Sequence, residues 1–351
     1  MNRQPTRHGR LSPEAAKTLR TIAFLPGWSI IAAATAVFLL GVSIPLSYQL
    51  LPLAASVLLL GLPHGAVDHL AIPRTRGDAI TARWLAAIGV LYLVVGGLYT
   101  IVWFLAPTIA VAFFIVLTWA HWGQGDVYPL AVLVDGTHPA GRGGRLLMAA
   151  MRGSLPMAVP FVAFPEQYEL VVTTLAGLFD PTAPAALSAV FTPTARLAVA
   201  VVIGGLIVST LVTGIRSTGT DDRHAFFIDA AEIGLLVAFF ATVPPILAIG
   251  LYFCFWHSIR HIARLLAVDP NAMPALESGR YGAALARFAR DSAPLTAVSL
   301  VLLVGLYFVI PGSVTEPLEL VGTYLVLIAV LTLPHVVVVV WMDREQRLWA
   351  G

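Results

Sequence analysis

The chain has 351 residues, of which 58% are hydrophobic and only 11% are charged. Soluble proteins carry roughly 45–50% apolar and about 25% charged residues, so this composition excludes a soluble globular domain and indicates an integral membrane protein. The net charge of +2 does not support nucleic-acid binding, and the single cysteine, Cys254, excludes an internal disulfide and a cluster of thiolate metal ligands.

Apolar runs of about 20 residues recur along the chain, and each is long enough to cross a hydrocarbon core as a helix. Pro45 and the pair Pro244 and Pro245 interrupt this pattern where two helix pairs must turn sharply. We therefore predict an all-α, polytopic transmembrane helical bundle of about ten helices. The predicted spans are approximately 22–44, 46–72, 84–105, 107–134, 146–164, 195–215, 226–243, 244–266, 293–311 and 317–341.

The chain is predicted to form one transmembrane domain between two short tails. Residues 1–21 form a basic N-terminal tail, residues 22–341 the helical domain, and residues 342–351 the C-terminal tail. The first apolar run is too long for a signal peptide and lacks a cleavage site of small residues, so it is interpreted as a membrane anchor.

Charge placement predicts the orientation, because cytoplasmic loops carry an excess of Lys and Arg. If the N-terminus is cytoplasmic, every one of the 21 Lys and Arg residues except Arg196 falls on the cytoplasmic side. We therefore expect a multi-pass protein of the cell membrane with both termini in the cytoplasm, and Arg260 and Arg264 reaching its inner surface. The alternative, eight or nine spans with one run lying flat on the membrane, would scatter the basic residues over both faces.

Histidines inside the spans are the main functional candidates, because ionisable groups are costly in a bilayer. His257 and His261 stand four residues apart, which places both imidazoles on one face of a helix. The predicted topology brings the others to a similar depth. The full set is His64 and His69 in GLPHGAVDHL, His121 in AHWGQGD, His257 and His261 in FWHSIRH, and His335 in LPHVVVV. The remaining histidines, His8, His138 and His224, are expected to be solvated.

Several interpretations of this cluster remain open at the level of the residues alone. Imidazoles can hydrogen-bond neighbouring helices, can ligate iron, copper, nickel or zinc, or can ligate haem. A proton or ion pathway is another interpretation, since four acids also fall within or beside spans: Asp68, Asp126, Asp229 and Glu232. Asp68 follows His64 by four residues and Asp126 follows His121 by five, so each can orient a ligand's free ring nitrogen or lie at an interface.

Together, the four histidine motifs resemble those of the Brp/Blh family of membrane carotenoid oxygenases, from about residue 50 to 341. The resemblance implies cleavage of β-carotene at its central 15,15′ double bond with O2, giving two molecules of all-trans-retinal. It implies a non-haem Fe(II) held by His64, His121, His257 and His261. His335 is expected to orient these ligands or to border the substrate. Because this family often occurs alongside retinal-using rhodopsins, a rhodopsin is the implied acceptor of the product.

An apolar polyene dissolved in membrane lipid would need an apolar tunnel past the metal. The aromatic residues that flank the predicted ligands are expected to line it, although lipid contact or core packing also explains them: Trp119, Trp122, Phe253, Phe255 and Trp256. The alternatives are another carotenoid substrate, a histidine-lined transporter or channel without a redox metal, and a di-iron desaturase. The last normally needs about eight histidines with adjacent H-x-x-H-H boxes, which are absent from this sequence.

Overall fold

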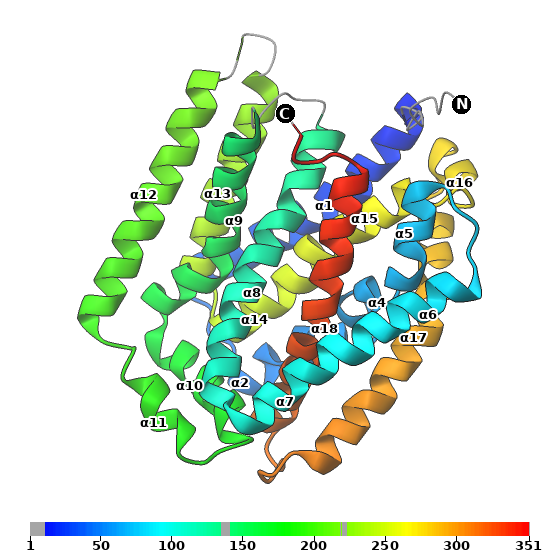
Figure 1. Cartoon of the computed structure of the whole chain (residues 1–351). Helices are drawn as coiled ribbons and strands as arrows, with labels where there is room; N and C mark the ends of the chain where they lie inside the picture. The colour runs from blue at the N-terminus through cyan, green and yellow to red at the C-terminus, as the bar shows by residue number, and fades with distance from the viewer. Residues whose placement is uncertain (1–10, 135–140, 218, 220–222, 351) are drawn as a thin grey trace.

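The computed structural model describes residues 11–134, 141–217, 219 and 223–350, and every regular element in them is helical. Long helices form a bundle that encloses several short ones (Figure 1). The predicted all-α class is thereby confirmed. His8 and His138 lie outside the described residues, as do residues 1–10 of the basic N-terminal tail, and His224 is exposed as expected.

The helices follow one another closely along the chain. In the first half they are α1 (Pro13–Leu39), α2 (Leu46–Gln49), α3 (Leu51–Ser56), α4 (Gly61–Gly65), α5 (Asp68–Arg76), α6 (Ala82–Leu91), η1 (Tyr92–Gly96), α7 (Gly97–Leu105), α8 (Pro107–Tyr128), η2 (Pro129–Leu133) and α9 (Gly141–Ala163). In the second half they are α10 (Pro165–Gly177), α11 (Ala183–Ser188), α12 (Pro193–Ser217), α13 (Arg223–Thr242), α14 (Pro245–Tyr252), η4 (Phe253–Ser258), α15 (Ile259–Ala267), α16 (Met273–Glu277), α17 (Tyr281–Val309) and α18 (Pro317–Glu345). The η segments are π-helical turns that continue the neighbouring α-helices.

Nine helical stretches of the described residues are long and apolar enough to cross a membrane, and each overlaps one predicted span. The chain is thus a multi-pass membrane protein. The tenth prediction, residues 107–134, corresponds to α8, which is helical but is not one of the nine. Its C-terminal half carries the polar residues His121, Gln124 and Asp126, which lower its hydropathy. All three side chains are buried inside the bundle.

Residues 46–76 form four short helices, α2 to α5, where a single span was expected. Pro63 is the third residue of α4. Proline lacks an N–H, and in a continuous helix its ring clashes with the carbonyl of the fourth residue before it. The chain therefore leaves the helical path over residues 57–60 and restarts at Gly61. This restart turns α4, and with it His64, into the interior.

The contact between α8 and α9 depends on two glycines. A Cβ added at Gly123 would lie 1.9 Å from the carbonyl oxygen of Ala149, and one added at Gly153 would lie 1.9 Å from that of Trp119. No side chain fits in either place, so glycine allows the two backbones to touch. This close approach holds the His121 segment of α8 in position.

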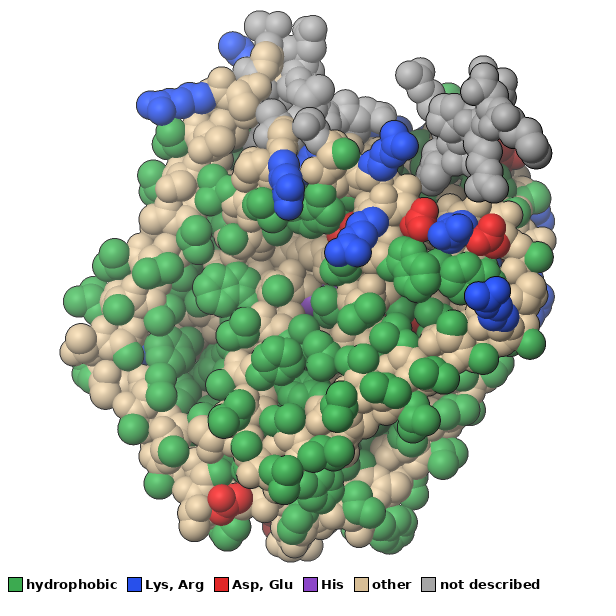
Figure 2. Space-filling view, in the orientation of Figure 1, with side chains coloured by type: hydrophobic (Ala, Val, Ile, Leu, Met, Phe, Trp, Pro, Cys, Tyr) green, Lys and Arg blue, Asp and Glu red, His purple; other side chains and the backbone are tan. Residues whose placement is uncertain are grey.

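The charged residues mark one end of the bundle. The first turn of α1 and the last turn of α18 lie at the same end, uppermost in Figure 1. Figure 2 shows Lys and Arg side chains gathered near that end, while hydrophobic side chains cover most of the face below them. This arrangement is typical of a protein surrounded by lipid below a basic, water-facing rim.

The expectation that Arg260 and Arg264 reach the membrane surface is wrong. Their exposed fractions are 1% and 2%, because carboxylates on other helices neutralise them inside the bundle. Arg260 pairs with Asp126 at 3.2 Å and with Glu232, and Arg264 pairs with Asp343 at 2.7 Å. A buried charge is tolerated only when it is paired and hydrogen-bonded in this way.

Candidate metal centre

Five buried histidines come together in the centre of the described bundle. They belong to five different elements: His64 to α4, His121 to α8, His257 to η4, His261 to α15 and His335 to α18. Ring centroids of neighbouring pairs lie 4.8–5.7 Å apart. The π-helical turn η4 carries His257, and such turns often occur at functional sites.

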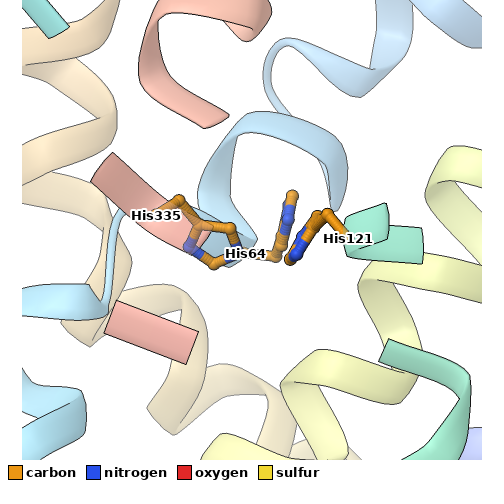
Figure 3. Close-up of side chains that lie close together, drawn as sticks. All are labelled: His64, His121 and His335. Carbon is orange, nitrogen blue, oxygen red and sulfur yellow. The ribbon is translucent and has the colours of Figure 1, made fainter. Parts of the chain in front are cut away.

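One ring nitrogen from each of His64, His121 and His335 lies within 4.8 Å of the other two. Figure 3 shows these three imidazoles side by side although they come from segments far apart in the sequence. A second set with the same property consists of Asp68, His261 and His335. His335, expected only near the ligands, therefore lies within the cluster.

Most of the clustered imidazoles have ring nitrogens without a hydrogen-bond partner among the described residues. Both nitrogens of His121 and of His257 are unpartnered, as are Nε2 of His261 and Nε2 of His335. Buried polar atoms are normally satisfied, so this group of unpartnered nitrogens in neighbouring rings requires an explanation. A transition-metal ion bound by neutral imidazoles supplies one, and these residues fit such an ion.

The hydrogen bonds of His64 define its tautomer. Its Nδ1 contacts the carbonyl oxygen of Gly61, at the start of the same short helix. A carbonyl oxygen only accepts hydrogen bonds, so Nδ1 carries the hydrogen and Nε2 keeps its lone pair. A backbone carbonyl commonly fixes the tautomer of a metal-binding histidine in this manner.

His257 depends on the absence of a side chain in the neighbouring helix. A Cβ added at Gly125 would lie 3.1 Å from Cε1 and 3.2 Å from Nδ1 of His257. The ring also stacks on Phe253 and contacts Trp122, with centroids 6.2 Å and 5.7 Å away. Gly125 therefore allows the imidazole to pack directly against α8.

The two carboxylates predicted to orient ligands differ in their surroundings. Asp68 accepts hydrogen bonds from His335 Nδ1 at 2.8 Å and from the Tyr92 hydroxyl at 2.5 Å. Asp126 pairs with Arg152 and Arg260 and accepts a hydrogen bond from the indole of Trp256. Asp68 thus touches a clustered histidine, whereas Asp126 belongs to the buried ion network, because both of its oxygens are engaged by cations and an indole.

That ion network joins four helices beside the histidines. Arg152 of α9 pairs with Asp126 of α8 at 3.0 Å, with Asp229 of α13 at 2.6 Å and with Glu232 of α13 at 2.9 Å. Arg260 of α15 shares two of these carboxylates. Of the acids considered for a proton pathway, Asp126, Asp229 and Glu232 therefore balance buried arginines, whereas Asp68 does not belong to this network.

A cavity of about 1090 Å³ opens beside the cluster, larger than the roughly 300–1,000 Å³ of ordinary ligand pockets. Apolar side chains dominate its wall, and His64, His121, His257 and His335 border it. It extends to the outside of the bundle, since Leu93 and Val301 also line it and are 76% and 72% exposed. A long apolar molecule dissolved in lipid can therefore reach the histidines from the side.

Of the five aromatic residues predicted to line a tunnel, Trp122 and Phe253 border this cavity. The assignment needs correction for Trp119, Phe255 and Trp256, which are absent from its wall. Trp119 donates to the Ala150 carbonyl of α9, and the backbone oxygen of Phe255 lies against Gly27 of α1. Trp256 stacks under the guanidinium of Arg260, 3.9 Å from its ring centroid, and donates to Asp126.

Tyr92 is a site residue that sequence reasoning missed. It lies in η1, lines the cavity and donates to Asp68. A tyrosine in an apolar span carries no distinguishing pattern, so no sequence signal identifies it. His69 also borders the cavity, but its Nδ1 lies 3.1 Å from the Ala66 carbonyl, within its own segment.

The family profile and the two relatives that follow carry the same description. The profile of the family described as beta-carotene 15,15′-dioxygenase matches residues 55–343. The chain is 44% identical to the probable beta-carotene 15,15′-dioxygenase Blh of Halobacterium salinarum, over 99% of both chains. It is 32% identical to the probable beta-carotene 15,15′-dioxygenase Brp of the same species, over 97% of this chain and 96% of the relative. No solved structure matches the chain.

Proposed function

Because the chain belongs to the β-carotene 15,15′-dioxygenase family, we propose that it cleaves β-carotene at its central 15,15′ double bond with O2. The products are two molecules of all-trans-retinal, in which each carbon of the broken double bond carries one oxygen atom. The observation that carries this proposal is a cluster of buried imidazoles with unpartnered nitrogens on the wall of a large apolar cavity.

The ion that fits this proposal is Fe(II), with His64, His121, His257 and His261 as its proposed ligands. When bound, non-haem iron supplies the one-electron chemistry through which O2 reacts with an organic substrate. The four side chains stand on separate elements and hold their rings in fixed orientations by packing on one another. Neutral imidazoles also add no charge to the apolar interior.

The other residues of the cavity bind and orient the substrate. Trp122 and Phe253 lie beside His257, so they would hold the middle of the polyene next to the metal. The apolar wall excludes water from the reacting double bond, and the opening beside Leu93 and Val301 admits substrate from lipid. Chemistry here needs no side-chain acid or base.

The proposed location is the cell membrane, with both chain ends in the cytoplasm. The gathering of Lys and Arg at the end that holds the first turn of α1 and the last turn of α18 supports this orientation. Retinal would leave the cavity through the same lipid-facing opening, from which a rhodopsin in the membrane could take it up.

The test is expression of the chain in a β-carotene-producing bacterium, with the pigments extracted and separated by chromatography. We expect loss of carotene colour and appearance of retinal with the wild type and with His224→Ala, whose side chain is exposed on α13. We expect neither with His257→Ala, although the protein still inserts in the membrane. Unchanged carotene with well-inserted wild type would instead favour another polyene substrate or a transporter.

A further inference from the structure

His335 occupies a central place among the clustered histidines. Its ring centroid lies 5.1 Å from that of His64, 4.8 Å from that of His121 and 5.0 Å from that of His261. The side chain is 4% exposed, and its Nε2 has no hydrogen-bond partner within the described part of the chain. A buried ring nitrogen is normally hydrogen-bonded, so one without a partner requires an explanation.

The other ring nitrogen of His335, Nδ1, has a defined hydrogen-bond partner. Nδ1 of His335 lies 2.8 Å from Oδ2 of Asp68, and the Tyr92 hydroxyl donates to the same oxygen at 2.5 Å. An ionised carboxylate only accepts hydrogen bonds, so Nδ1 of His335 carries the hydrogen. Its Nε2 therefore keeps a lone pair, which is the form of the ring that binds a metal ion.

We infer that His335 is a fifth imidazole ligand of the ion proposed above, and that Asp68 and Tyr92 position it. A ring nitrogen of His335 lies within 4.8 Å of ring nitrogens of His64 and His121. A carboxylate that accepts the second N–H of a ligating histidine fixes its orientation and makes it a stronger donor. This inference rests on the proposed function, because the ion is the same.

Asp68 is assigned as a positioning residue, although it also forms a close group with His261 and His335. Its Oδ2 already accepts two hydrogen bonds, one of them from His335. An acceptor that acts through His335 has no effect on the ion once that ring is removed. An independent ligand would keep its effect, so the two roles give different results in a double-mutant cycle.

The experiment measures iron content and Fe(II) affinity of the purified protein by chelator competition. The variants are His335→Ala, Asp68→Asn, the double variant and Tyr92→Phe, with His69→Ala as control, since that ring bonds within its own segment. We expect at least 100-fold weaker binding for His335→Ala, partly restored by free imidazole. We expect about 10–100-fold weaker Fe(II) binding for Asp68→Asn, which is the usual cost of losing such a carboxylate, and a few-fold weaker binding for Tyr92→Phe.

The double variant is expected to bind Fe(II) as weakly as His335→Ala alone, and His69→Ala to bind like the wild type. Wild-type affinity in His335→Ala would overturn the inference while leaving the proposed function intact, as would an equal effect of Asp68→Asn with and without His335. A wild type that binds no iron would overturn both. If His335→Ala does not fold, the other variants decide. Unchanged Fe(II) affinity in both Asp68→Asn and Tyr92→Phe would then overturn the inference.

Discussion

At the scale of single residues, the site depends on a glycine as much as on its histidines. Replacing Gly125 by Ala places a methyl group 3.1–3.2 Å from the His257 ring, closer than ordinary contact. The imidazole must then shift by a few tenths of an ångström. Since a misplacement of 1 Å costs about 10²-fold in rate, we expect retinal formation to fall about tenfold in Gly125→Ala.

The matched control is Gly205→Ala on α12, where an added methyl group meets nothing within 4 Å. Chromatography of retinal, normalised to the amount of membrane-inserted protein, compares the two variants. Equal activity of Gly125→Ala and Gly205→Ala would show that the position of His257 tolerates this shift, contrary to the proposed ligand role.

The sequence predicted the members of the site better than their contacts. The six candidate histidines that spacing and topology select include all five that the structure clusters, and the structure brings Asp68 to one of them. The partner of Asp68 is His335, 267 residues away, whereas the sequence left open which histidine Asp68 would orient. Local spacing cannot reveal such pairs, because they depend on how α5 and α18 pack.

At the scale of elements, Arg152 joins α8, α9 and α13 through buried carboxylates and is completely buried itself. Removing one partner of a buried ion pair leaves an uncompensated charge and costs about 3–5 kcal/mol. We therefore expect Arg152→Met to lower the free energy of unfolding in detergent by about that amount, measured by chemical or thermal unfolding.

Arg290→Met, on an exposed position of α17, is the control and should unfold like the wild type. If Arg152→Met were as stable as this control, the ion network would not hold the helices together. Failure of the variant to accumulate in the membrane, with normal accumulation of Arg290→Met, agrees with the prediction.

Helix positions were largely predictable, because long apolar runs have few other structures available in lipid. The interruption of residues 46–76 was not predicted, since Pro63 is compatible with a kinked helix as well as with a restart. The burial of Arg260 was also missed. Its partners Asp126 and Glu232 stand on other helices, and a basic residue near a helix end ordinarily reaches water.

At the scale of the whole molecule, the bundle separates three environments. A basic end faces water, an apolar surface faces lipid, and a buried polar centre holds the histidines beside a cavity that opens to the lipid side. An apolar substrate and O2 can both reach this centre from lipid without passing through water. Charge placement predicted the first environment and composition the second, while the histidine motifs and the family resemblance predicted the third.

The most direct test of iron-dependent cleavage uses the purified protein in lipid nanodiscs, stripped of metal with a chelator and supplied with β-carotene and O2. Retinal formed and carotene consumed are measured with and without added Fe(II). We predict two molecules of retinal per β-carotene with Fe(II), and no cleavage without metal or with Mg²⁺, which prefers oxygen ligands. Cleavage by the metal-free protein, or intact β-carotene with the iron-loaded protein, would contradict a histidine-bound iron centre that cleaves this substrate.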